Sequence, residues 1–245
     1  MELVVSEKSD PAINLALEEF LFNKTDMEYA LFYVNAPSVI IGCNQVWENE
    51  VNADFCRQHA IPVYRRISGG GAVYHDYGNL NYCFISNKKG DKTDLNAEFL
   101  KPIIVSLTTF GCQPVVGKRK DLWLPDGFKF SGTASHVTAN RVLHHGTLLY
   151  DTDIDKLTGA LAAKKVNSAV KGIASVPSPV KNIRTFCLEN NRPVRAPSAF
   201  FNKMIDGAKF VTGITQTITP DEAMMKAVEL LANEKYRDES WNKKK

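Results

Sequence analysis

The sequence predicts one domain of the α+β class, with mixed, mostly antiparallel sheets flanked by helices. Short runs of β-forming residues are concentrated between residues 29 and 86, whereas helical periodicity dominates from residue 153 onward. This segregation favours an α+β arrangement over the strict alternation of a doubly wound sheet. A composition of 44% hydrophobic and 23% charged residues is sufficient for one sizeable core.

A helix is predicted over residues 11–23, after a short extended lead. Asp10 is a residue type preferred at the N-cap, and Pro11 suits the first helical position. Apolar side chains then recur at helical spacing at Ile13, Leu17, Phe20 and Leu21.

The strands of the predicted sheet come next, separated by Pro, Gly, Asn and Asp. They are expected at residues 30–34, 39–43, 62–65, 72–74 and 80–86. A helix over residues 96–110 follows, with Gly111 just past its end. Two further strands are expected at residues 122–124 and 143–150.

The second half of the chain is predicted to be rich in helices, at residues 153–163, 197–209 and 220–235. Thr219 and Glu222 have the spacing of a capping box at the start of the last helix, with Pro220 as its first residue. The final residues 242–245 are predicted to form a frayed tail.

Charge and composition exclude several classes of protein. The formal net charge of +3 gives no excess of the kind that follows a nucleic-acid backbone. Nucleic acid is therefore not expected as a partner. The chain also lacks the basic start of a signal peptide and any run of eighteen apolar residues. No membrane partner is expected, and a cytoplasmic protein is predicted. Five widely spaced cysteines are expected to be reduced thiols and not a zinc site. Three of them lie in apolar runs, such as those around Cys43 and Cys83, and are expected to be buried.

One segment, residues 65–76, carries a recognisable anion-binding pattern. Arg65, Arg66 and Ser68 directly precede the three consecutive residues Gly69–Gly71. Backbone N–H groups of consecutive glycines can approach an anion closely, and arginines can add forked hydrogen bonds. Because neighbours on a strand point apart, one of the two arginines is expected to reach the ligand; a flexible turn is the alternative for the glycines. The spacings of phosphate-binding and dinucleotide-binding loops are absent.

Residues 65–82 resemble the signature of the lipoate-protein ligases and related lipoyltransferases. Further stretches also match, in the family's order, so the resemblance extends from about residue 10 to residue 185. These stretches are residues 14–19, 120–122, 128–134, 144–149, 171–176 and 180–183. It implies a catalytic domain like that of the biotin and lipoate protein ligases, spanning residues 1–245. The family's small C-terminal accessory domain is expected to be absent or supplied by another chain.

The resemblance implies that the protein joins lipoate or octanoate to ATP, giving lipoyl-AMP, and then transfers the acyl group to a lysine of a lipoyl carrier domain. ATP and Mg²⁺ are therefore expected cofactors, and the carrier is expected to be a 2-oxoacid dehydrogenase E2 or a glycine cleavage H protein. Two alternatives stay open: a lipoyltransferase that uses preformed lipoyl-AMP, and a non-catalytic relative that binds the adenylate or the lipoyl domain. An octanoyltransferase is disfavoured because no cysteine lies between Cys112 and Cys187.

The same resemblance implies the site residues. Lys129 matches the catalytic lysine that contacts both the carbonyl and the phosphate of the adenylate. The other residues expected to bind lipoyl-AMP are Arg65, Ser68, Gly69, Gly70, Gly71, Ala72, Ser131, Gly132, His145, Gly146 and Thr147. Val73, Lys120 and Asp121 are expected at the nucleotide, with Asp121 also at Mg²⁺.

Three features beside the expected site residues depart from the family pattern or are interpreted as structural. Lys120 stands where the family commonly has Asn. His144 and His145 point to opposite sides of a strand, so one is expected to pack against the glycine loop and the other to be exposed. His75 and Asp76 are interpreted as structural.

Overall fold

The centre of the fold is a six-stranded sheet with the strand order β10-β11-β6-β2-β1-β12. The computed structural model describes residues 1–23, 27–88, 95–162 and 172–244. The pairs β10–β11, β11–β6 and β6–β2 are antiparallel, whereas β1 runs parallel to both β2 and β12. The strands are β1 (Glu2–Val5), β2 (Tyr29–Tyr33), β6 (Asn79–Asn87), β10 (Thr133–Val137), β11 (Arg141–Leu149) and β12 (Thr217–Ile218).

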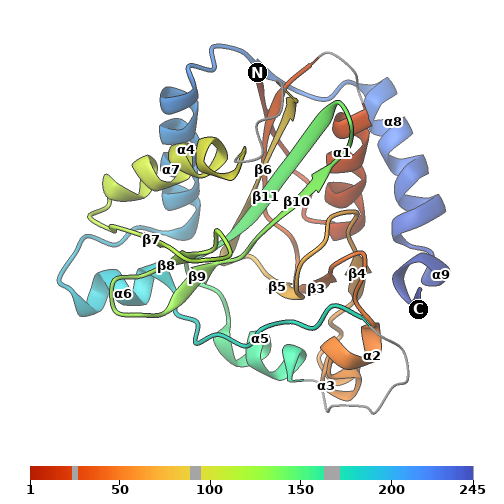
Figure 1. Cartoon of the computed structure of the whole chain (residues 1–245), viewed down its shortest axis with the longest axis horizontal. Helices are drawn as coiled ribbons and strands as arrows, with labels where there is room; N and C mark the ends of the chain where they lie inside the picture. Colours follow the sequence, from red (N-terminus) through yellow and green to blue (C-terminus); the bar gives the residue numbers. More distant parts are fainter. Residues whose placement is uncertain (24–26, 89–94, 163–171, 245) are drawn as a thin grey trace.

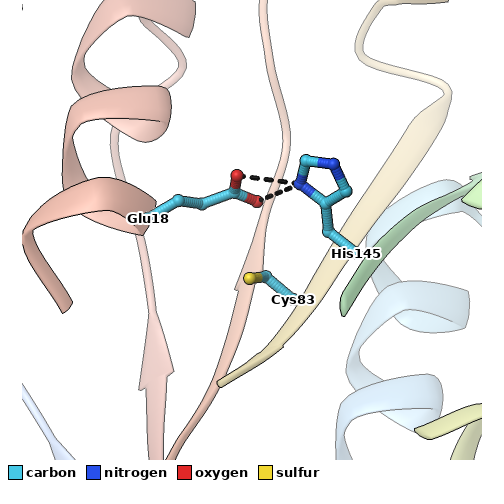
Figure 2. Close-up of side chains that lie close together, drawn as sticks. All are labelled: Glu18, Cys83 and His145. Carbon is cyan, nitrogen blue, oxygen red and sulfur yellow. Dashed lines mark hydrogen bonds and ion pairs between the residues drawn. The ribbon is translucent and has the colours of Figure 1, made fainter. Parts of the chain in front are cut away.

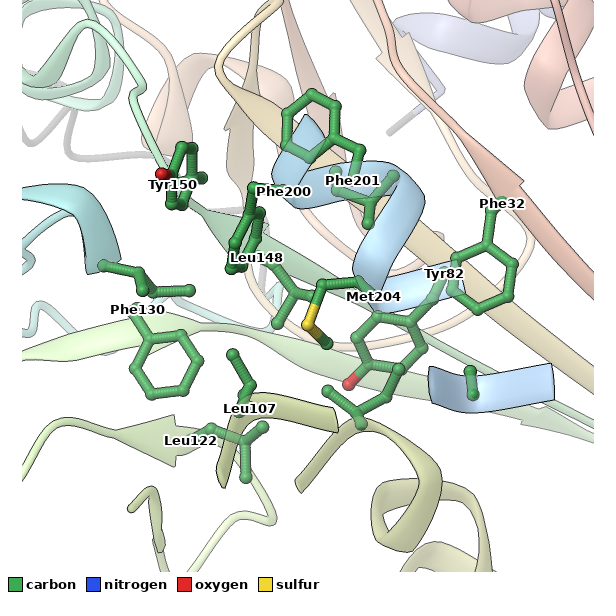
Figure 3. Packing of buried hydrophobic residues seen from close by; sticks show 14 of the residues in the cluster. Phe32, Tyr82, Leu107, Leu122, Phe130, Leu148, Tyr150, Phe200, Phe201 and Met204 are labelled. Carbon is green, nitrogen blue, oxygen red and sulfur yellow. The ribbon is translucent and has the colours of Figure 1, made fainter. Parts of the chain in front are cut away.

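Helices cover both faces of this sheet (Figure 1). One face packs against α4 (Leu95–Thr108) and α7 (Pro197–Thr212), and the other against α1 (Pro11–Asn23) and α8 (Glu222–Leu231). Alternation along β2 explains the two cores, because Phe32 points to the first face and Leu31 to the second. Figure 3 shows the first core, where side chains of α7 meet those of β6 and β11; Tyr150 stacks on Phe200 with ring centroids 3.9 Å apart.

Two small sheets complete the domain. The first has the order β4-β3-β5 and comprises β3 (Ser38–Ile41), β4 (Val63–Arg65) and β5 (Val73–His75). The second has the order β7-β8-β9 and comprises β7 (Val115–Val116), β8 (Leu122–Trp123) and β9 (Lys129–Ser131). The remaining elements are short helices: α2 (Trp47–Glu50), α3 (Ala53–Gln58), α5 (Ile154–Leu161), α6 (Ile183–Glu189), the π-helix η1 (Ala232–Tyr236) and α9 (Glu239–Asn242).

The start of α1 is as predicted, but the start of α8 is not. Asp10 caps α1, since its Oδ1 accepts a hydrogen bond from the Ala12 N–H at 2.8 Å. At α8 the capping residue is Asp221, which accepts from the Met224 N–H at 2.7 Å, and the helix begins at Glu222. The prediction of a Thr219 cap is wrong because the carboxylate of Asp221, two residues later, provides the cap.

The last residues also differ from the prediction. Asn242 ends α9 and is buried, so the predicted frayed tail does not begin there. Several short elements were not predicted, namely β7, β10, β12, α2, α3, α6 and α9. Ala163 and Lys171, which belonged to a predicted helix and a matched stretch, lie outside the described residues.

All five cysteines are free thiols, and four of them are buried, including Cys83 as predicted. Cys43 is partly exposed, so the prediction that it is buried is wrong. Among the helices in the described ranges, none has the length and apolarity that crossing a lipid bilayer requires.

Candidate active site

A cavity of about 390 Å³ lies between the glycine loop, residues 68–72, and the strands β9 to β11. Leu15, Tyr33 and Ile40 supply apolar surface to its wall. The predicted site residues that line it come from three segments of the chain: Gly70, Gly71, Ala72 and Val73; Asp121, Lys129 and Gly132; and His145, Gly146 and Thr147. The fold therefore brings together most of the residues that the resemblance implied.

Two glycines, one beside the glycine loop and one within it, do not tolerate a side chain. A Cβ on Gly42 would lie 2.2 Å from the carbonyl oxygen of Gly70, so the turn after β3 supports the loop directly. Gly70 itself has a φ of +87°, in the left-handed region where a side chain is strained. The Cys43 N–H donates to the Ser68 carbonyl at 2.9 Å and fixes the start of the loop.

Arg66 is the arginine that reaches the cavity. Its guanidinium donates to the carbonyls of Gly69 and Gly71, to the Ile40 carbonyl at 3.1 Å, and through Nε to Ser68 Oγ at 2.9 Å. Burial lowers the pKa of Arg66 to about 10, partly opposed by the charge of Glu18, so the group remains cationic at neutral pH. Arg66 thus holds the glycine loop closed around a positive charge.

Arg65 points the other way, and its assignment to the ligand is corrected. Its side chain is 1% exposed and does not line the cavity. Six backbone carbonyls accept from its guanidinium: those of Gly42, Cys43, Gln45, Trp241, Asn242 and Lys244. The two arginines, the last residue of β4 and the residue after it, point to opposite sides as expected, but the side chain that faces the cavity is that of Arg66.

On the opposite wall, Lys129 and Asp121 form an ion pair. Lys129 Nζ lies 3.1 Å from Asp121 Oδ2, and Arg119 Nη2 lies 3.6 Å from the same oxygen. Burial disfavours the charged form of Asp121, yet hydrogen bonds from Trp123 and Lys129 and the Lys129 charge outweigh it and hold the pKa of this carboxyl below its usual range. Asp121 is therefore an anion at neutral pH that is already shared by two cations.

His145 is joined to the glycine loop as predicted for one of the two histidines. Ser68 Oγ lies 2.7 Å from His145 Nε2, and His145 Nδ1 lies 2.9 Å from Glu18 Oε2. Figure 2 shows Glu18 reaching from α1 toward this ring, with the thiol of Cys83 beside it. Glu18 was not predicted as a site residue, because it lies in an ordinary helical pattern.

Glu18, Cys83 and His145 offer three donor atoms within 4.8 Å of one another, which raises the possibility of a metal centre. Both imidazole nitrogens are engaged by Ser68 and Glu18. Burial and the nearby Glu18 raise the pKa of the Cys83 thiol well above its usual range, whereas a metal ligand must be a thiolate. These residues do not fit a metal ion.

The other histidine, His144, is buried, and the prediction that it is exposed is wrong. Its Nδ1 lies 3.0 Å from Ser135 Oγ, and its ring stacks on Phe99 with centroids 5.5 Å apart. Burial lowers its pKa to about 3, so the ring is neutral at physiological pH. His144 is buried because β11 is an inner strand of a sheet covered on both faces.

As predicted, Asp76 is structural, since it accepts from the N–H groups of Gly78 and Asp153.

A second cavity, of about 740 Å³, adjoins the first. Ala72, Val73, Lys129, Gly132 and Thr147 line both, and Ser131 lines the second. Residues 172–178 form part of its wall, and sequence reasoning did not identify the hydrogen bonds that hold them. Ser175 Oγ accepts from the Ala72 N–H at 2.9 Å and from Gln45 Nε2 at 3.1 Å, and the Ser175 N–H donates to Glu50.

Besides Arg65, three predicted residues line neither cavity. Ser68 and Gly69 act through their bonds to His145 and Arg66. Lys120 has a φ of +63°, and its carbonyl accepts from Thr133 Oγ1 at 3.1 Å. Its backbone thus shapes the turn that carries Asp121.

The two joined cavities define a catalytic domain suited to an elongated acid held beside a phosphate. The first provides apolar wall and backbone donors, and Lys129 stands where the two meet. A lysine at such a junction can neutralise a carboxylate and a phosphate that react with each other.

The comparisons with known proteins agree with this class. The family model named lipoyl protein ligase A/B catalytic domain matches residues 10–199 of the sequence, and the chain belongs to this family. Lipoate-protein ligase LplJ of Bacillus subtilis is 38% identical over 236 residues, which cover 96% of this chain and 70% of the relative.

Two solved structures share the fold over almost the whole chain. One is part of an archaeal lipoylation system, described as a bi-partite lipoate protein ligase and its E2 lipoyl domain from Thermoplasma acidophilum; the TM-score is 0.82 at 27% identity, covering 99% of this chain and 95% of the other. The other is lipoate-protein ligase A bound with ATP, with a TM-score of 0.83 at 26% identity, covering 99% and 98%.

Proposed function

We propose that the described part of the chain works as one catalytic domain that activates lipoate, or octanoate, with ATP and transfers the acyl group to a carrier lysine. The observation that supports this most directly is the position of Lys129, which lines both cavities and faces Asp121 at 3.1 Å. Membership of the ligase family and the ATP-bound relative agree with it.

The first step joins two anions. A carboxylate oxygen of the acid attacks the α-phosphorus of ATP, a new O–P bond forms, and the bond to pyrophosphate breaks. The Lys129 ammonium is placed to offset the charge on the carboxylate and the α-phosphate together. The glycine loop, held by Arg66, offers backbone donors, and the Ala72 N–H becomes available once Ser175 Oγ releases it.

The second step transfers the acyl group. The amine of the carrier lysine attacks the acyl carbonyl, an amide bond forms, AMP leaves with the electron pair of the broken C–O bond, and the amine loses a proton. The cation that stabilised the first transition state serves again, because the same carbonyl and phosphate oxygens carry the developing charge.

Asp121 fits Mg²⁺ as a single protein ligand. Mg²⁺ commonly binds through one or two carboxylates while phosphates and water complete its shell. In the present structure Lys129 and Arg119 both lie at Oδ2 of this carboxylate, so a metal ion would share the negative charge of Asp121 with them. The metal would supply charge neutralisation at the polyphosphate.

We further propose that the acceptor is a lipoyl carrier domain of a 2-oxoacid dehydrogenase E2 or of a glycine cleavage H protein. An E2 lipoyl domain accompanies the bi-partite ligase of Thermoplasma acidophilum. A reducing compartment such as the cytoplasm agrees with the five free thiols.

The deciding experiment separates the two half-reactions. The chain is incubated with Mg·ATP and lipoate, and pyrophosphate is measured; in parallel it is given synthetic lipoyl-AMP and an apo lipoyl domain, with and without an added accessory chain. Pyrophosphate release together with transfer supports the ligase. Transfer without pyrophosphate in every mixture identifies a lipoyltransferase instead, and failure of both reactions contradicts catalysis.

A further inference from the structure

A buried chain of hydrogen bonds links the cavity cation to a carboxylate on α1. It runs from Arg66 Nε to Ser68 Oγ at 2.9 Å, from Ser68 Oγ to His145 Nε2 at 2.7 Å, and from His145 Nδ1 to Glu18 Oε2 at 2.9 Å. Ser68 and Glu18 are at most 1% exposed. The chain therefore connects the glycine loop, β11 and α1, and its Ser68 and Glu18 members are shielded from bulk water, whereas Arg66 and His145 border the cavity.

The chemistry of each group fixes the direction of every bond. A carboxylate only accepts, and Glu18 Oε1 already accepts from the Tyr33 hydroxyl at 2.9 Å. His145 Nδ1 must therefore carry a proton and donate to Glu18. Arg66 Nε–H only donates, so Ser68 Oγ accepts from it. Within the described residues His145 Nε2 is the one acceptor in reach of the Ser68 hydroxyl proton, so Ser68 donates to it. The result is one defined tautomer of the His145 ring.

The two ends of the chain carry opposite charges. Within the described residues, the other acceptors around the Arg66 guanidinium are the carbonyls of Ile40, Gly69 and Gly71. A buried cation without a compensating anion is costly, and Glu18 supplies that anion through His145 and Ser68. Removing the charge of Glu18 should leave Arg66 without its counter-charge and free it to turn.

We propose that Glu18 is a positioning residue that acts through His145 and Ser68 to hold Arg66 against the glycine loop, and so sets the loop for binding the acid and its adenylate. This inference rests on the proposed function. Arg66 bonds the carbonyls of Gly69 and Gly71 on the two sides of Gly70, so its orientation decides how the loop is folded.

The test compares Glu18→Gln with Glu19→Gln. Glu19 is the next residue of α1, is also largely buried, and also bonds a tyrosine and a cation, Tyr236 and Lys235, on the side of the helix away from the cavity. Both changes remove one buried charge of α1. We expect Glu18→Gln to raise the KM for lipoate about tenfold or more, with a much smaller change in kcat. Glu19→Gln should leave the KM within about twofold of the wild type.

Ser68→Ala breaks the same chain at another link. Its effect on KM should not add to that of Glu18→Gln, because the second change acts on a chain that is already broken. Equal KM values in Glu18→Gln and wild type, or full additivity with Ser68→Ala, would overturn the inference.

A ligand-free measurement separates this inference from the proposed function. In ¹⁵N NMR spectra the His145 ring should be protonated at Nδ1 and not at Nε2, and the Arg66 Nε–H should exchange slowly with water. The slow exchange should persist in Glu19→Gln and disappear in Glu18→Gln. The opposite tautomer overturns the inference whether or not the protein activates lipoate, and an inactive protein with the expected spectra sinks only the proposed function.

Discussion

The two walls of the cavity are built in contrasting ways. On the wall formed by the glycine loop, Arg66, Ser68, His145 and Glu18 are buried and bonded to one another and to backbone. On the facing wall, Lys129 pairs with another side chain, Asp121, and is 19% exposed. Folding therefore completes the first wall, whereas the second holds a cation whose present partner a ligand can replace. The glycine-loop wall therefore gives the cavity a fixed shape, and the facing wall supplies a cation that can pair with a bound ligand.

The largest expected effect comes from removing the adaptable cation. Lys129→Met should lower the rates of adenylate formation and of transfer from lipoyl-AMP by about 10²- to 10³-fold, because the charge that offsets both reacting anions is lost. The free energy of unfolding should fall by about 1–3 kcal/mol, measured by urea denaturation, because the buried Asp121 carboxylate keeps Arg119 but loses Lys129.

Lys181→Met is the matched control for this change. Lys181 is also largely buried and ion-paired, to Asp126 and Glu189, and lines neither cavity. It should keep wild-type rates. Rates within threefold of wild type in Lys129→Met would remove this lysine from the chemistry.

A smaller effect is expected on the preformed wall. Gly70→Ala and Gly127→Ala place the same methyl group at nearly the same φ, +87° and +88°. Both should lose about 1–2 kcal/mol of unfolding free energy. At Gly70 the new Cβ would also lie 3.1 Å from Arg66 Nη2, whereas at Gly127 it meets nothing within 4 Å.

Affinity for lipoate, measured by calorimetry, should therefore fall in Gly70→Ala alone. Equal affinities in the two variants would show that the glycine loop tolerates a side chain. The contrast between a preformed and an adaptable wall would then be wrong.

The smallest effect is expected at Lys120, in the turn that leads into Asp121 on the Lys129 wall of the cavity. Lys120 has a φ of +63°, which Asn tolerates better than Lys. Lys120→Asn should raise the free energy of unfolding by about 0.5–1 kcal/mol, measured by thermal and urea denaturation. An unchanged KM for ATP would indicate that residue 120 serves the turn through its backbone. A large rise would instead place its side chain at the nucleotide, as the family resemblance implied.

Sequence reasoning identified the ordered motifs because they combine unusual residues at close spacing, such as three glycines after two arginines. It assigned Arg65 to the ligand where the structure has Arg66, since a period of two separates neighbours without saying which side faces the ligand. Glu18 and Ser175 escaped notice because their roles depend on partners more than a hundred residues away, His145 and Gln45. Strands of two residues, such as β7 and β12, are too short to show a period.

The carbonyl cage around Arg65 has a practical consequence for handling the protein. Trp241, Asn242 and Lys244 supply half of the oxygens that solvate this guanidinium, immediately beside Arg66. A version shortened before Trp241, or one whose affinity tag displaces that segment, would leave the buried Arg65 guanidinium without half of its hydrogen-bond acceptors, next to the substrate pocket. Purification handles and fluorescent reporters are therefore better attached ahead of Met1, which is 39% exposed.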